Sequence, residues 1–301
     1  MSNLLLPNWL SKHLFVYRPD NLATEQLHDL RKRLAKFNVE KPEVSIVIPA
    51  YNEEANLLHT LSSLADQNLT RPTELLVVNN NSADRTQELL DRCGVRSITE
   101  RRPGVAFARQ AGLEAARGIY MANADADCLY PAGWVEAITK PLHDPAIACA
   151  YGLYAFLPSQ NSSRLALMGY EKIAQLVNSI RNRDKLFMNV YGFNFAFRRA
   201  DALAVGGFAL DSGREGSVAE LVAAGIKPPP SGKCEDGWMS LSLQQQGKGR
   251  TVRVTDPAAR VWTSDRRLLA DGSLGKAFTT RVWQAVRGLT LPFSASGSTP
   301  S

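Results

Sequence analysis

The sequence predicts an α/β protein with a mostly parallel sheet flanked by helices, and three observations lead to that prediction. Apolar segments of strand length alternate with helical patterns from residue 44 onward. The chain has 301 residues with 45% hydrophobic content, which is ample for a sizeable core. Its longest apolar runs, such as 45–50 and 75–78, are far shorter than the roughly 20 residues of a membrane-spanning helix. We therefore expect a single domain that does not cross a bilayer.

The individual elements follow from residue 44. We expect strands at 44–48, 75–78, 95–98 and 119–122. We expect helices between them at 53–66, 83–92 and 105–117. Strands and helices repeated in this way predict parallel strands, with ligands bound beyond the carboxyl ends of those strands. No Gly-x-Gly-x-x-Gly follows the first strand, so a dinucleotide site is disfavoured.

Residues 1–40 form an expected N-terminal extension of this domain. Its helix, at 23–36, has Leu27, Leu30 and Leu34 on one face. Such a face packs on the domain or lies on a membrane surface, and packing is the more common outcome.

The second half of the chain is less regular than the first. A helix is expected at 164–182 and a strand at 194–198, and two Gly- and Pro-rich stretches, 211–216 and 227–232, are expected to be mobile loops. The tail after residue 291 is expected to be disordered. We divide the chain at residues 40, 130 and 267, with a C-terminal helix and tail at 268–301.

Composition narrows the function classes. The formal charge of +6 suits anionic small molecules or an anionic membrane surface, and no zinc-finger or RNA-recognition pattern indicates nucleic acid. The four cysteines include no Cys-x-x-Cys pair, which fits reduced thiols and argues against zinc. The N-terminus lacks the pattern of a secretory signal, so a cytoplasmic location is favoured. Peripheral contact with the inner face of the membrane is left open by these observations.

Two carboxylates one residue apart, Asp125 and Asp127, follow the apolar run 118–123. In a strand, residues i and i+2 point to the same side, so both carboxylates can face one small volume past the strand end. Such a pair suits magnesium or manganese, which take one or two protein carboxylates and complete their shell with water and phosphates. The alternative is a turn or helix cap before residues 131–134, and for an isolated Asp-x-Asp that interpretation is the better one.

The ordered series of motifs resembles glycosyltransferase family 2, the inverting nucleotide-sugar transferases of GT-A fold, whose sheet is Rossmann-like. The resemblance extends over about residues 43–267. It implies a nucleotide-binding half at 41–130 and an acceptor half at 131–267. Its segments are 44–54, 76–86, 104–112, 125–127, 191–199, 205–208 and 234–241. The order of these segments carries the resemblance, because each of them is weak alone.

The resemblance implies a set of residues that bind the nucleotide sugar. Those residues are Pro49, Tyr51, Glu53, Asn80, Arg109, Asp125, Arg266 and Arg267. Tyr51 would border the base, and Arg109 would touch the base or lie beside the phosphates. The family usually has aspartate where Asn79 and Asn80 stand, so the contact to the base becomes an amide contact. Asp125 would hold the ribose or bridge to the metal, and Asp127 would coordinate manganese (Mn2+) or magnesium (Mg2+) on the diphosphate.

The resemblance also implies the catalytic pair and one departure from the family. Asp236 would be the catalytic base with Glu235 positioning or tuning it, although two acids at a helix start also serve as a cap. The family often supplies a third metal ligand, commonly histidine, after the late strand that we expect at 258–262. The four histidines of this chain all lie upstream, so Asp265, water or phosphate would replace that ligand. Arg266 and Arg267 would help to neutralise the diphosphate or form a solvated pair.

These implications predict a metal-dependent inverting glycosyltransferase, a hexosyltransferase of polysaccharide biosynthesis. A UDP-sugar is the favoured donor and GDP-mannose its main rival, and the acceptor would be a hydroxyl of a glycan or lipid-linked glycan. The alternative is a non-catalytic nucleotide-sugar-binding or scaffold protein of the same fold. A nucleotidyltransferase is disfavoured, because residues 50–54 are acidic where such an enzyme needs a basic, glycine-rich phosphate loop.

Overall fold

The structure, a computed structural model, describes residues 6–15, 24–159, 162–182, 185–208, 235–265 and 268. They belong to two compact units, which we treat separately. The larger unit contains the described residues of 6–155 and 186–263, and the smaller one those of 156–185 and 264–268. The expected loops at 211–216 and 227–232, the tail, Arg266 and Arg267 lie outside the described residues.

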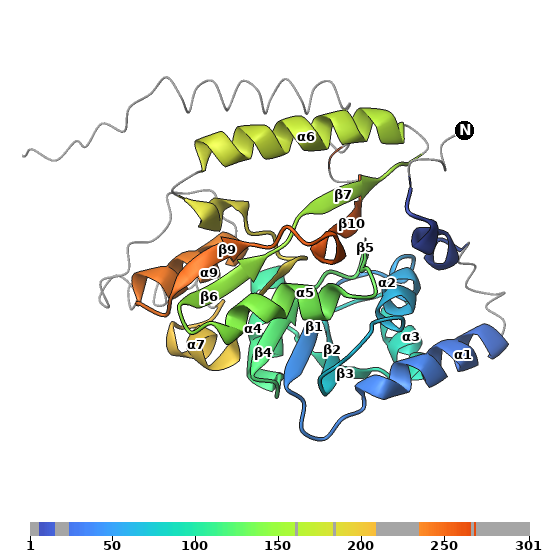
Figure 1. Cartoon of the computed structure of the whole chain (residues 1–301). Coiled ribbons are helices and arrows are strands. Elements are labelled where there is room, and N and C mark those ends of the chain that lie inside the picture. The colour runs from blue at the N-terminus through green and yellow to red at the C-terminus, as the bar shows by residue number, and fades with distance from the viewer. Residues whose placement is uncertain are drawn as a thin grey trace, which may run out of the picture. The chain divides into compact units, whose positions relative to one another are not determined.

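The larger unit is built on a seven-stranded sheet with the order β3-β2-β1-β4-β8-β6-β9 (Figure 1). These strands are β1 (Val44–Ala50), β2 (Thr73–Asn79), β3 (Arg96–Thr99), β4 (Tyr120–Asn123), β6 (Ile147–Tyr151), β8 (Phe195–Arg198) and β9 (Arg250–Arg253). The first four are parallel to one another, whereas β8 is antiparallel to both β4 and β6. The sheet is therefore mostly parallel, as predicted.

The two central strands explain why the sequence folds this way. β1 and β2 are buried at nearly every position, so both faces of the sheet are covered and neither strand alternates polar with apolar residues. On one face α4 (Val105–Ala115) lies close to the sheet, since a β-carbon added to Gly112 would lie 2.4 Å from Cγ1 of Val47. Glycine at 112 thus permits the close packing of helix on strand.

The remaining described helices of this unit connect and cover the strands (Figure 1). They are α2 (Leu57–Leu64), α3 (Thr86–Cys93), α5 (Trp134–Thr139), α7 (Arg199–Ala204), α9 (Glu235–Gln245), and the 3-10 turns η5 (Lys140–His143), η6 (Leu186–Asn189) and η8 (Pro257–Ala259). Helix α3 begins at 86, three residues later than expected, because the Asp84 carboxylate accepts from the Thr86 amide at 3.0 Å and forms a turn just before the helix.

The late strand predicted at 258–262 was misplaced. Pro257 starts the turn η8, and the Asp256 carboxylate caps that turn by accepting from the Ala258 amide at 2.8 Å. The strand itself is β10 (Val261–Ser264), which pairs antiparallel with the short β5 (Cys128–Leu129). Proline with a capping aspartate favours a turn over a strand, so the apolar pattern was read too early.

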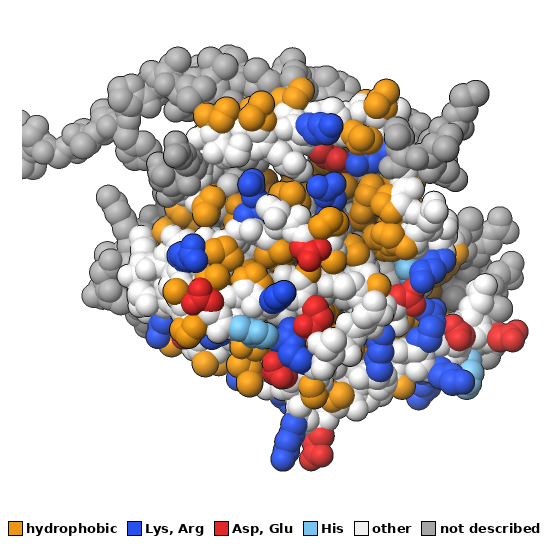
Figure 2. Space-filling view, in the orientation of Figure 1, with side chains coloured by type: hydrophobic (Ala, Val, Ile, Leu, Met, Phe, Trp, Pro, Cys, Tyr) orange, Lys and Arg blue, Asp and Glu red, His pale blue; other side chains and the backbone are white. Residues whose placement is uncertain are grey.

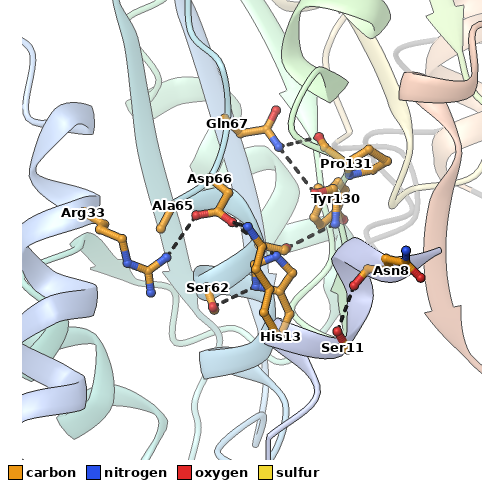
Figure 3. A network of polar contacts seen from close by, with 12 residues as sticks. Asn8, Ser11, His13, Arg33, Ser62, Ala65, Asp66, Gln67, Tyr130 and Pro131 are labelled. Carbon is orange, nitrogen blue, oxygen red and sulfur yellow. Dashed lines mark hydrogen bonds and ion pairs between the residues drawn. The ribbon is translucent and has the colours of Figure 1, made fainter. Parts of the chain in front are cut away.

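The N-terminal elements are part of the larger unit. They are η2 (Asn8–His13), α1 (Thr24–Leu34) and η4 (Ala35–Phe37), and the apolar face of α1 is buried in the same core as β1 and α2. A polar network attaches them to the end of α2 (Figure 3). His13 Nδ1 lies 2.9 Å from the Ser62 hydroxyl, and Asp66 accepts from Arg33 at 3.1 Å and pairs with Lys12.

The smaller unit contains the long helix α6 (Arg164–Arg181) and the end of β7 (Tyr154–Leu157). Glu171 on α6 is buried, where it pairs with Arg164 at 2.6 Å and accepts from the Phe156 amide at 2.7 Å. The opposite face of α6 is apolar and exposed, as the orange side chains along it in Figure 2 show. In the portion of the chain that the structure describes, no helix has the length and hydropathy needed to cross a membrane.

Candidate active site

Two loops at the carboxyl edge of the sheet are tied together by their own polar groups. The Asn52 side-chain oxygen accepts from the Ala83 amide at 2.8 Å, and the Asn52 amide donates to the Ser82 hydroxyl at 3.0 Å. Asn52 also has a φ of 52°, a left-handed conformation that asparagine tolerates. The neighbouring Tyr51 is 62% exposed, at the edge where a nucleotide base is expected. Pro49 lies at the end of β1, and Glu53 in the same loop accepts from the Asn56 side chain at 2.8 Å.

Asn80 organises the segment that leads into α4. Its side-chain amide donates to the carbonyls of Glu100 and Arg102 at 3.0 and 2.7 Å, and its oxygen accepts from the Gly104 amide at 2.9 Å. The side chain is 5% exposed. These three bonds use one oxygen and both amide hydrogens of Asn80, so the side chain shapes residues 100–104 and the start of α4.

The Asp-x-Asp segment is held from three sides as it leaves β4. The Ala124 amide donates to the Val47 carbonyl of β1 at 3.0 Å. The Thr60 hydroxyl of α2 contacts the carbonyls of Ala126 and Cys128 at 2.7 and 2.8 Å. The Asp125 amide donates to the Tyr130 hydroxyl at 2.8 Å. These hydrogen bonds tie the backbone around both aspartates to β1, α2 and Tyr130, and a site of defined geometry needs such supports.

Two protonated groups beside these aspartates, the Cys128 thiol and the Tyr130 phenol, are buried. The Cys128 thiol donates to the Asp127 carboxylate at 3.5 Å, and burial together with the two aspartates raises the pKa of that thiol well above its ordinary value. Burial likewise raises the pKa of the Tyr130 phenol well above its usual range. Both groups stay protonated at neutral pH, so they contribute hydrogen bonds and no negative charge to the site.

Arg109 brings the two acidic motifs together. From the buried face of α4, its Nη2 donates to Asp125 at 2.9 Å, and its Nε lies 3.4 Å from both Glu235 and Asp236 at the start of α9. The residue is 2% exposed. Burial disfavours its charge, but the carboxylates of Asp236, Asp125 and Glu235 outweigh burial, and the pKa of Arg109 is raised. A buried guanidinium thus fixes carboxylates that lie more than 100 residues apart in the chain.

Gly192 completes the contact around this arginine. Its carbonyl accepts from Arg109 Nη1 at 2.9 Å. A β-carbon at this position would lie 2.0 Å from Arg109 Nη2 and 2.8 Å from Oδ1 of Asp236. Since real β-carbons do not approach other atoms so closely, only glycine allows the guanidinium to reach its place.

The charge balance of the site fits a cation. Within the described part of the chain, the carboxylates of Asp125, Glu235 and Asp236 contact the guanidinium of Arg109, and Asp127 lies two residues beyond Asp125. Among the described residues, no three or more His, Cys, Asp or Glu side chains form a metal-binding group. Two carboxylates with a phosphate-bearing substrate are the usual magnesium arrangement, so the residues present fit a cation that arrives with its substrate.

Some site residues were beyond the reach of the sequence patterns. Thr60, Tyr130 and Gly192 shape the site, and only their positions beside the acidic motifs in space reveal it. Asp265, considered as a third metal ligand, belongs to the smaller unit, where it accepts from the Ser159 amide at 3.0 Å. Arg266 and Arg267 are not among the described residues.

Comparison with known proteins agrees with this architecture. The family model described as glycosyl transferase family 2 matches residues 45–204, which is more than half of the chain. The chain belongs to glycosyltransferase family 2. The match covers the strands of the nucleotide half, the Asp-x-Asp segment and β8, and the family consists of glycosyltransferases of GT-A fold.

Individual members of glycosyltransferase family 2 are similar over shorter stretches. The uncharacterized glycosyltransferase EpsJ of Bacillus subtilis is 31% identical over 104 residues, covering 33% of this chain and 30% of EpsJ. The undecaprenyl-phosphate 4-deoxy-4-formamido-L-arabinose transferase of Pseudomonas paraeruginosa is 40% identical over 97 residues, 29% of each chain. The matches thus span about a third of the length of such curated relatives.

A solved structure supports the fold over a longer stretch. The mannosyltransferase PcManGT of Pyrobaculum calidifontis, in complex with GDP-Man and Mn2+, has a TM-score of 0.53 and 17% sequence identity. The comparison covers 91% of this chain and 83% of that protein. At this identity the likeness shows the shared GT-A fold.

Proposed function

We propose that the protein is a metal-dependent inverting glycosyltransferase that moves a sugar from a nucleotide sugar to an acceptor hydroxyl. One observation carries the proposal. The Asp125 carboxylate after β4 and the two carboxylates at the start of α9 converge on the buried Arg109, at the carboxyl edge of the sheet. Displacement at a sugar carbon needs acids that act on the nucleophile and acids that hold a metal on the leaving group. The two kinds of acid must lie close together, because both the nucleophile and the leaving group require positioning.

The reaction assigns one task to each end of the cluster. Asp236 accepts the proton of the acceptor hydroxyl while that oxygen attacks the anomeric carbon. The bond from this carbon to the diphosphate breaks, and the nucleoside diphosphate leaves with its electron pair. Glu235, in the same first turn of α9, positions Asp236 through the shared contact with Arg109.

Asp125 and Asp127 are the residues that would hold manganese or magnesium. Such a cation, when bound, neutralises charge on the departing diphosphate. Among the described residues of this cluster, three carboxylates contact one guanidinium, which supports the assignment, as does the Mn2+ in the complex of PcManGT. The hydrogen bonds that hold the backbone around both aspartates support it further.

The donor side is assigned to the loops after β1 and β2. The exposed ring of Tyr51, with Pro49 and Glu53 beside it, would border the base, and Asn80 would act by shaping residues 100–104. A UDP-sugar remains our first choice. GDP-mannose is the second candidate, because PcManGT is described with GDP-Man. Arg266 and Arg267 stay assigned to the diphosphate.

The acceptor is proposed to be a hydroxyl of a glycan or lipid-linked glycan, as in polysaccharide biosynthesis. The relative from Pseudomonas paraeruginosa supports the lipid-linked choice, since its name specifies undecaprenyl phosphate. A lipid-linked acceptor would bring the protein to the inner face of the membrane, where its formal charge of +6 favours anionic lipid. Cosedimentation with anionic and with neutral vesicles tests that location.

A binding and turnover experiment tests the proposed function. Nucleoside diphosphates and nucleotide sugars are screened by thermal shift with and without MnCl2, because a ligand that binds the native state raises its melting temperature. We expect UDP or a UDP-sugar to give the largest metal-dependent shift, and the same nucleotide sugar to be hydrolysed slowly by the parent protein. Binding without any turnover would support the non-catalytic alternative, and equal shifts with all bases would contradict the assigned base pocket.

A further inference from the structure

We propose that Arg109 is a positioning residue for the catalytic base, and that it does not bind the nucleotide sugar. This inference rests on the proposed function and corrects the role in base or phosphate binding that the sequence implies. Arginines near a diphosphate usually act as its ligands, with their forks directed at phosphate oxygens. Here the contacts of the guanidinium point to a different partner.

The nitrogens of Arg109 are already directed at the protein. Nη1 donates to the Gly192 carbonyl and Nη2 to Asp125, both at 2.9 Å, while Nε faces Glu235 and Asp236 at 3.4 Å. With 2% of the residue exposed, almost no surface remains for a substrate. An arginine that binds phosphate would need N–H groups that are open to the incoming diphosphate.

Burial makes this arrangement stiff. Leaving a buried charge without its partner is costly, so the carboxylates and the guanidinium hold each other in place. Asp236 is itself 6% exposed, which limits the number of positions that its carboxylate can take. Because Arg109 stands on α4 and the acids on α9 and after β4, one side chain sets the distance between the base and the metal-side aspartate.

The glycine at 192 gives independent support. A side chain there would overlap the guanidinium, which would have to move away from Asp236 and Asp125. The close approach of the Gly192 backbone to both Arg109 and Asp236 therefore limits where the guanidinium can lie. Lysine could not replace this arginine, since one ammonium cannot reach the Gly192 carbonyl, Asp125 and Asp236 together.

The first test compares R109K and R109A with the parent enzyme. We expect both variants to lower kcat about a hundredfold, the scale of losing a positioned base, while the affinity for UDP or GDP changes less than about threefold. Affinity is measured by calorimetry with saturating MnCl2. Millimolar guanidinium chloride should restore part of kcat in R109A but not in R109K, with sodium chloride at equal ionic strength as the control.

The second test displaces the arginine without removing it. G192A should lower kcat with little change in nucleotide affinity, and guanidinium should not rescue it because the guanidine group is still present. G169A is the matched control, since a β-carbon at Gly169 meets nothing within 4 Å. R117M is the control for a structural arginine, because Arg117 pairs with the buried Glu74 at the amino end of β2, and it should leave kcat unchanged.

The outcomes separate the inference from the proposed function. An active parent whose R109K and R109A variants lose nucleotide affinity more than tenfold would make Arg109 a donor ligand and overturn the positioning role. Unchanged kcat in R109A and G192A would overturn it as well. A parent that neither binds nor turns over any nucleotide sugar would overturn the proposed function and the positioning role with it.

Discussion

At the residue scale, Asp127 should carry most of the metal dependence. We expect D127A to abolish the effect of manganese on nucleotide binding, and D125A to weaken that effect, because these two carboxylates are the oxygen ligands presented after β4. Titration of UDP and GDP by calorimetry with and without MnCl2 measures the effect. D91A, at an exposed position on α3, is the matched control. If nucleotide binding by D127A still depends on manganese, the assignment of the metal site to residues 125–127 is wrong.

The two acids of α9 should differ in effect although they are neighbours. D236N should reduce sugar transfer about a hundredfold or more with nearly unchanged donor affinity, since an amide keeps the shape of the side chain but cannot take a proton. E235Q should be milder if Glu235 only positions its neighbour. Single-turnover transfer and calorimetry measure the two quantities. The opposite ranking would move the base to Glu235, and parental rates in both variants would reduce the pair to a helix cap.

The site shows how far residue patterns reach. The sequence predicted two groups of acids: Asp125 and Asp127 after an apolar run, and Glu235 and Asp236 at a helix start. The structure brings Asp125, Glu235 and Asp236 into contact with one arginine, Arg109. The part played by Gly192 could not be predicted, because it depends on a backbone that approaches Arg109 from 83 residues away. Glycine has no side chain, so its residue type in the sequence does not indicate such a contact.

At the scale of elements, helix α6 should respond to substitution on one face only. Leu167 is fully buried, so L167A should destabilise the protein by about 2–5 kcal/mol. Leu176 is 60% exposed, and L176A should change the free energy of unfolding by about 0.5 kcal/mol or less. Urea denaturation of the two variants measures the difference. Equal losses would mean that the outer face of α6 is covered in solution.

Helices and strands could be predicted from the sequence where the local hydrophobic pattern alone determined them. Strands β1 and β2 are buried on both faces, so their apolar runs indicated them directly. Helix α2 starts at Leu57, four residues later than expected, because the polar groups of residues 52–56 are used in contacts with the next loop. Those contacts are made with residues about 30 positions away, so local propensity could not anticipate them.

At the scale of the whole molecule, acid should weaken the fold through His13. Burial lowers the pKa of His13 to about 4, although Asp66 opposes the shift. Between about pH 6.5 and pH 4 the unfolded chain therefore binds the proton more readily than the folded protein, and stability falls as pH falls through this window. We expect the melting temperature of the parent to drop more between pH 7 and pH 5 than that of H13Q.

The control for this pH effect is H28Q, because His28 is exposed on α1. It should keep the pH dependence of the parent. An equal drop in H13Q and the parent would show that other groups govern acid sensitivity, and that the attachment of η2 to α2 is insensitive to protonation.

The reversed direction of β8 has a consequence for labelling the protein. Because β8 is antiparallel to β4, the beginning of β8 lies at the edge of the sheet where the parallel strands end. The end of β8 lies at the opposite edge, where the Arg199 amide donates to the Ile119 carbonyl just before β4 begins. A fluorophore or affinity tag joined near the start of β8 would intrude on chemistry. The same tag on α7, which follows that strand at the far edge, would report on the enzyme without disturbing it.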